Sequence, residues 1–288
     1  MKAKKDQGVL AKLRNICPVN VTGFDKFFLK HAMIPIFKGF LAQGCVMLGE
    51  ANMGKTPVAL AACLMLSRYF ITTYNLEADP QLRQASDLDF FRGEPGTVFQ
   101  PFLLDDSNLA LQAMGKLKTF LGVSEEEAMT YQRWGASKFV RNQFRLANAN
   151  TYDAQAEATI PGMFQGDEVD RLPKAKFYEL IEPALMKNTS KQDVDALLKR
   201  ACFIVVSQKY VYMKKGAQDV VIRYRNESGS FLTPEAGARY MAWKENGVLP
   251  ADDLLRAEVD VEQRLFNRIV MGKPPQQSRW ARGALLQP

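Results

Sequence analysis

CVMLGEANMGKTPVALAACLML, residues 45–66, predicts a strand, a loop and a helix in direct succession. The stretch opens with apolar residues, passes through a loop bounded by Gly49 and Gly54, and continues from Lys55 and Thr56 into an alanine-rich run. Two glycines at this spacing, followed by Lys-Thr, are typical of a phosphate-binding loop. A simple glycine turn is the alternative.

The residue types of this loop suit the binding of a phosphorylated ligand. Glycines let the backbone approach phosphate oxygens closely, so that N–H groups and the helix N-terminus point at the anion. Lys55 would reach the β- and γ-phosphates, and the Thr56 hydroxyl would bind Mg²⁺. We expect nucleotide contacts from Gly49, Glu50, Ala51, Asn52, Met53, Gly54, Lys55, Thr56 and Pro57.

The composition is that of a soluble globular protein with an excess of positive charge. The chain has 288 residues, 47% hydrophobic and 24% charged, with a formal net charge of +7. Such a charge favours anionic partners, of which nucleic acid is the commonest. Four widely spaced cysteines indicate neither a disulfide framework nor a zinc site, which favours a nuclear or cytoplasmic location. The apolar stretches are short or interrupted, so no membrane span is expected.

Strands and helices are expected to alternate through residue 150. Residues 23–42 have apolar positions at helical spacing, and residues 109–138 have a helical pattern. Strands are expected at 69–75, 98–106 and 139–150. This order predicts an α/β fold, a three-layer sandwich with a mostly parallel central sheet.

The remaining segments are expected to lie around this core of residues 23–195. Residues 1–22 are predicted to form a basic N-terminal arm, with a short helix or a targeting peptide as alternatives. Residues 196–271 are predicted to form a small α+β addition, with strands beginning at Cys202 and Asp219 and helices at 234–245 and 251–271. The tail 272–288 is expected to be disordered.

Polar side chains follow two of the expected strands. Asp105 and Asp106 come directly after PFLL, and such a pair can bind Mg²⁺ through one carboxylate and polarise an attacking water with the other. Asn150 ends the next strand and could hydrogen-bond the γ-phosphate or the water. A turn after a strand is the ordinary alternative for each.

Four motifs together resemble one family. In order, GEANMGKT, FLLDD, QRWGASKF and RLANAN are similar to the Walker A, Walker B, B-prime and C motifs of the superfamily 3 helicase domain found in circovirus-like replication-associated proteins. The resemblance covers residues 40–180. It implies a P-loop NTPase fold, ATP and Mg²⁺ as cofactors, single-stranded DNA as a partner and a homo-oligomeric ring, a hexamer by resemblance.

The resemblance also implies roles for individual residues. Asp105 would bind the metal, Asp106 would activate water and Asn150 would be the sensor, whereas Arg171 would act on the γ-phosphate held by a neighbouring subunit. For DNA contact, the candidates are Arg133, Trp134 and Lys138, which combine positive charge with an aromatic face.

Two departures from the family pattern bear on these roles. Ala149 stands where the family commonly has serine, which leaves Asn148 as a rival sensor. The chain has a single histidine, His31, whereas the nicking endonuclease of the family uses a histidine pair; that endonuclease is therefore expected to be absent.

Three functions compete. The leading one is an ATP-dependent DNA helicase or translocase that hydrolyses ATP to move on single-stranded DNA. A small-molecule or nucleotide kinase shares the phosphate loop, but it would transfer phosphate to an acceptor other than water. A domesticated replication protein that binds NTP and DNA with slow turnover is the third, although the presence of Lys55, Thr56, Asp105 and Asp106 weighs against it.

Overall fold

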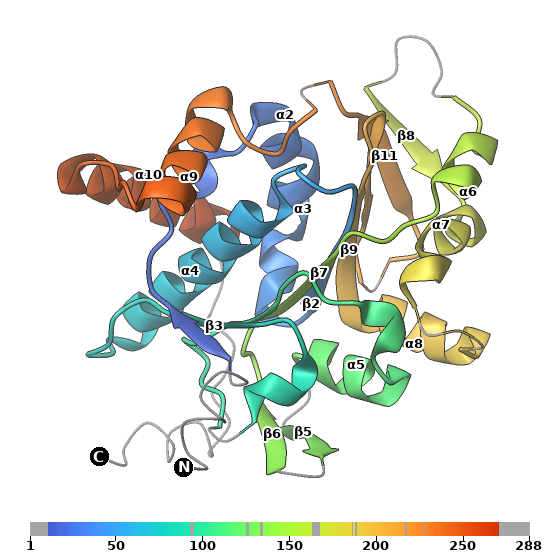
Figure 1. The fold of residues 1–288 in the computed structure, drawn as a ribbon, viewed down its shortest axis with the longest axis horizontal. Coiled ribbons are helices and arrows are strands. Elements are labelled where there is room, and N and C mark those ends of the chain that lie inside the picture. Colours follow the sequence, from blue (N-terminus) through green and yellow to red (C-terminus); the bar gives the residue numbers. More distant parts are fainter. Residues whose placement is uncertain are drawn as a thin grey trace.

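A computed structural model describes residues 11–92, 95–124, 127–132, 135–162, 168–185, 187, 189–216, 218–227 and 229–270. They form an α/β fold in which a nine-stranded mixed sheet is flanked by helices on both faces (Figure 1). The strand order is β1-β3-β4-β7-β2-β9-β10-β11-β8, and a separate hairpin joins β5 and β6. The predicted α/β class is confirmed.

The centre of the sheet is parallel and its edges are antiparallel. The parallel strands are β3 (Leu82–Ala85), β4 (Phe102–Leu104), β7 (Arg145–Ala149), β2 (Gly44–Gly49) and β9 (Ala201–Val206). Antiparallel pairing adds β10 (Tyr210–Lys214), β11 (Val221–Arg225) and β8 (Val169–Leu172) on one side and β1 (Lys12–Arg14) on the other.

Two hydrophobic cores lie on opposite faces of the sheet. Successive side chains of a strand point to opposite faces, so Cys45 and Met47 of β2 enter one core while Val46 and Leu48 enter the other. The first core is covered by α2 (Lys26–Phe28), α3 (Ile34–Phe37), α4 (Lys55–Tyr74), α9 (Pro234–Asn246) and α10 (Asp252–Val270). The second is covered by α5 (Met114–Leu121), α7 (Lys174–Ile181) and α8 (Lys191–Arg200), and α6 (Ala154–Thr159) lies against α7.

Short helical turns complete the layers. A π-helix spans Leu29–Met33, and 3-10 turns span Val21–Gly23, Lys38–Leu41, Leu88–Phe91, Leu109–Leu111 and Glu182–Ala184. The helices expected within residues 23–42 are therefore present as a broken series, and α9 and α10 match the helices expected near the C-terminus.

Helix α4 follows the phosphate loop and runs through the first core. Pro57 lies in its first turn, where a missing N–H breaks no helical bond, and Asn75 ends it in the left-handed conformation (φ 48°). By length and hydropathy this helix alone among the described residues could cross a membrane, but 72% of its apolar window is buried inside the protein. Burial of this kind is typical of a helix in a protein core, and such helices pass the same test of length and hydropathy.

Three expected elements differ from the structure. The strand expected at 69–75 is the last part of α4: its aromatic and β-branched residues favour a strand, but they continue the helix that precedes them. The helical pattern at 109–138 yields only α5, followed by the β5–β6 hairpin (Glu127–Gln132 and Gly135–Val140). The strand expected at 139–150 is divided between β6 and β7.

The strands assigned to a C-terminal addition belong to the central sheet. β9 pairs in parallel with β2 along its whole length, and β10 and β11 continue the sheet from there. Strand pairing joins segments distant in the chain, so these strands extend the sheet, and the boundary expected at residue 196 falls within α8. Part of the expected basic arm, Lys12–Arg14, forms the edge strand β1. Residues 1–10 and the expected tail 272–288 lie outside the described residues.

Candidate functional site

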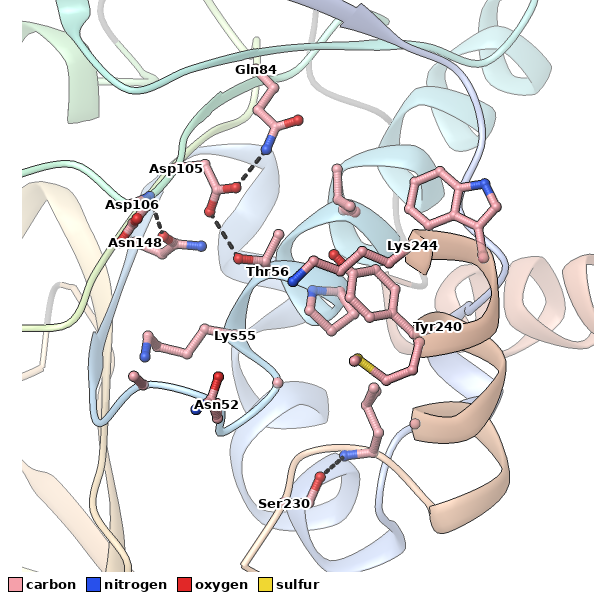
Figure 2. Close-up of a pocket in the computed structure, with 18 of the residues that line it drawn as sticks. Asn52, Lys55, Thr56, Gln84, Asp105, Asp106, Asn148, Ser230, Tyr240 and Lys244 are labelled. Atoms are coloured by element: carbon pink, nitrogen blue, oxygen red, sulfur yellow. Dashed lines mark hydrogen bonds between the residues drawn. The ribbon is translucent and has the colours of Figure 1, made fainter. Parts of the chain in front are cut away.

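The predicted phosphate loop opens onto a pocket at the carboxyl edge of the parallel strands. β2, β7 and β4 are adjacent and parallel, so the loops that follow them meet at one edge. The pocket has a volume of about 820 Å³ (Figure 2). Its lining includes these predicted site residues: Ala51, Asn52, Gly54, Lys55, Thr56, Pro57, Asp105, Asp106, Asn148 and Asn150.

The loop has a backbone that requires glycine at Gly49. Gly49 has φ 138°, a value that L side chains rarely adopt, and a Cβ atom there would lie 2.0 Å from the carbonyl oxygen of Val206 in β9. Gly54 (φ 84°) and Asn52 (φ 64°) are also left-handed. The loop therefore begins where β2 lies tightly against β9.

Lys55 lies buried within the curve of the loop. Its Nζ donates a hydrogen bond to the carbonyl oxygen of Gly49 at 2.9 Å and another to that of Glu50. Burial lowers the pKa of Lys55 from 10.5 to about 8, and the negative charges of Asp106, Asp105 and Glu50 oppose this shift. A cation that is poorly hydrated and held by neutral carbonyls is well placed to bind an anion.

Thr56 and Asp105 present two oxygen ligands side by side. The Thr56 hydroxyl donates to Asp105 Oδ1 at 3.1 Å, and Gln84 of β3 donates to the other carboxylate oxygen (Figure 2). Hydroxyl and carboxylate oxygens suit Mg²⁺, which usually completes its shell with substrate phosphates and water. Within the described ranges, no group of three His, Cys, Asp or Glu residues could hold a metal by itself. The donor set fits a magnesium ion brought in with a nucleotide.

The asparagines at the end of β7 both contact Asp106, in different ways. Asn148 is buried, and its Oδ1 accepts from the backbone N–H of Asp106 at 2.8 Å. Asn150 is exposed, and its Nδ2 donates to the Asp106 carboxylate at 2.8 Å. Asp106 itself is left-handed (φ 50°). Asn148 therefore holds the backbone of Asp106, whereas Asn150 contacts its carboxylate.

Two polar contacts at the site were not anticipated from the sequence. Gln84 lies in a polar segment that showed no strand pattern, and its role depends on β3 pairing with β4. Tyr152 follows β7 and donates from its hydroxyl to Glu50 Oε1 of the loop at 2.8 Å. Burial raises the pKa of Tyr152, which keeps it a donor. Neither residue has a sequence signal beyond its proximity to a motif.

Of the candidate DNA-contacting residues, the structure describes Lys138, which lies in the β5–β6 hairpin. Arg133 and Trp134 lie outside the described residues. Lys138 is exposed on β6. The hairpin precedes the amino end of β7, so it lies at the other end of the parallel strands from the pocket (Figure 1).

Arg171 lies far from the pocket of its own chain. It is exposed on β8, the edge strand, which β9, β10 and β11 separate from β2. Arg223 of the neighbouring β11 is instead buried, ion-paired with Asp170, and its guanidinium lies over the Tyr210 ring. Only a second subunit could bring Arg171 to a phosphate loop.

Comparison of the sequence with models of known protein families and with curated proteins gave no match. Function is therefore inferred from the geometry of the site.

Proposed function

We propose that this protein is an ATPase that hydrolyses ATP and couples the reaction to movement on single-stranded DNA. The observation that carries the proposal is the contact between Thr56 of the loop and Asp105 at the end of β4, across the intervening strand β7. A glycine turn has no need of a carboxylate placed against its first helical hydroxyl, whereas a nucleotide-bound Mg²⁺ needs both oxygens.

In this proposal each side chain has a separate task. Lys55 turns from the loop carbonyls to the β- and γ-phosphates, while Thr56 and Asp105 hold Mg²⁺, which neutralises charge on the phosphates. Asp106, exposed at the pocket, accepts a proton from the attacking water. Asn150 orients the Asp106 carboxylate through the 2.8 Å hydrogen bond from its amide.

The coupling to DNA is proposed from charge and from the hairpin. The net charge of +7 favours a polyanion, and the neighbouring residues Arg133 and Trp134 of the sequence combine a cation with an aromatic ring that can stack on a base. Arg171 on the exposed sheet edge would serve a neighbouring subunit, which requires an oligomeric ring.

Phosphate release from ATP, measured with and without single-stranded DNA, tests the proposal. We expect release that DNA stimulates and that Lys55→Ala abolishes. Lys187→Ala is the matched control, because Lys187 is exposed and away from the pocket. Folded protein that binds DNA but releases no phosphate would contradict the motor. Phosphate transfer to a nucleoside would instead identify a kinase.

A further inference from the structure

The segment after β11 crosses the phosphate loop and begins α9 beside it. The backbone N–H of Phe231 donates to the carbonyl of Met53 in the loop at 3.3 Å. The same segment pairs with the N-terminal part of the chain, where Thr233 N–H donates to Gly23 O at 3.0 Å. Thr233 then caps α9 by accepting from the N–H of Ala236. These bonds place α9 against the pocket.

Further contacts hold α9 in place. Ala236 is fully buried, and a Cβ atom on Gly23 would lie 2.8 Å from the Cβ of Ala236, so the two segments approach as closely as glycine allows. Arg239 pairs with Glu258 of α10 at 3.0 Å, and Asn20 donates to the same carboxylate. Because the N-terminal segment and α10 both hold α9, we expect its position to change little when a ligand binds.

The pocket face of α9 is aromatic. Gly237, Tyr240 and Lys244 recur at helical spacing and line the pocket together with Trp243. The Tyr240 and Trp243 rings lie 5.8 Å apart, and burial raises the pKa of Tyr240 to about 12. Figure 2 shows Tyr240 beside the start of α4, with Lys244 extending towards Thr56.

The pocket therefore combines charged and aromatic groups. Its lining includes Lys55, Thr56 and two carboxylates, and also Leu60 of α4 and the aromatic residues of α9. The charged groups suit a triphosphate with its metal. A flat ring with polar edges, such as a nucleobase, suits the aromatic residues, because stacking on an aromatic side chain uses the π-face that every base has.

We propose that α9 binds the base of the nucleotide, with Tyr240 as the stacking surface and Trp243 as the adjoining apolar edge. This inference rests on the proposed nucleotide site, and it adds that α9 selects nucleotides by stacking. Larger rings stack more strongly, so purine nucleoside triphosphates bind more tightly than pyrimidine ones.

Calorimetric titration with ATP and with tripolyphosphate tests this inference, because tripolyphosphate has the phosphate chain of ATP without its base and ribose. For Tyr240→Ala we expect ATP affinity to fall roughly 5- to 150-fold, the range of a lost base stack, and tripolyphosphate affinity to stay unchanged. Tyr240→Phe keeps ATP affinity within about twofold, since the ring remains. The preference for ATP over CTP disappears in Tyr240→Ala. Glu245→Ala, on the same helix outside the pocket, is the matched control.

The outcomes separate this inference from the proposed function. Unchanged ATP affinity in Tyr240→Ala overturns the stacking role, as does an equal loss for both ligands, which would place the effect at the phosphates. If wild-type protein binds neither ligand, the nucleotide site itself fails, and the inference with it. Thermal unfolding of each variant shows whether a loss of affinity reflects a loss of fold.

Discussion

Thr56 and Asp105 are 49 residues apart in the sequence, and the Thr56 hydroxyl donates a 3.1 Å hydrogen bond to Asp105 Oδ1. The contact joins the first turn of α4 to the end of β4, with β7 between β4 and β2. It is the place where a divalent cation would find two oxygen ligands of the protein.

Removing the Thr56 hydroxyl should lower the affinity of the nucleotide site for Mg²⁺. In Thr56→Val we expect the apparent Mg²⁺ affinity, titrated at fixed ATP, to fall on the order of tenfold, because one oxygen ligand is lost. Thr56→Ser keeps the hydroxyl and should bind Mg²⁺ as the wild type does. Equal Mg²⁺ titrations for the wild type and Thr56→Val would argue against a metal at this position.

The affinity for ATP should fall as pH rises through about 8. Lys55 binds phosphate only when protonated, and its pKa in the folded protein is about 8, below the ordinary 10.5. The charge is therefore present below pH 8 and lost above it, so the Kd for ATP should rise on the order of tenfold between pH 7.5 and 9.5. In Lys55→Arg the guanidinium stays charged, and this slope should vanish. Calorimetry at several pH values measures both; a flat wild-type profile would place Lys55 away from the phosphates.

The two asparagines at the end of β7 should differ in what they affect. Asn148→Ala leaves the backbone N–H of Asp106 without its partner, so we expect a loss of about 1–2 kcal/mol in the free energy of unfolding. Asn150 is exposed, so Asn150→Ala should cost under about 0.5 kcal/mol but lower the rate of ATP hydrolysis. Urea unfolding and phosphate release distinguish the two. The reverse pattern would make Asn148 the catalytic asparagine.

Gly49 should tolerate no side chain. A Cβ atom would lie 2.0 Å from Val206 O at a φ of 138°, so Gly49→Ala should destabilise the protein by about 2–4 kcal/mol. A Cβ atom at Gly115 in α5 would instead point into open space, and Gly115→Ala should be neutral or stabilising by up to about 1 kcal/mol. Thermal unfolding of both variants checks the comparison. Equal stabilities would mean that β2 and β9 can separate at no cost.

Arg171 should act only between subunits, because three strands separate β8 from β2. We expect no ATP hydrolysis from a preparation that contains only Arg171→Ala or only Lys55→Ala. An equal mixture should recover about a quarter of the wild-type rate, since one site in four then combines an intact Lys55 with a neighbour's Arg171. A mixture that forms mixed oligomers and remains inactive would show that Arg171 does not act on the phosphates bound by a neighbouring subunit.

Much of the site could be read from local sequence. The loop from Gly49 to Thr56, the acids after β4 and the asparagines at the end of β7 all lie where a strand ends, and the carboxyl ends of parallel strands meet at one edge. Such signals depend on residues close together in the chain. The α/β class follows from the same alternation of strand and helix.

Only the tertiary structure decided the rest. The last part of α4 has residues that favour a strand but continue the helix that precedes them, and the place of β9 beside β2 depends on pairing between segments about 150 residues apart. Gln84 reaches Asp105 because β3 pairs with β4, and Tyr240 reaches the pocket because α9 packs against Gly23. These relationships join residues that are distant in the chain, and no local pattern encodes them.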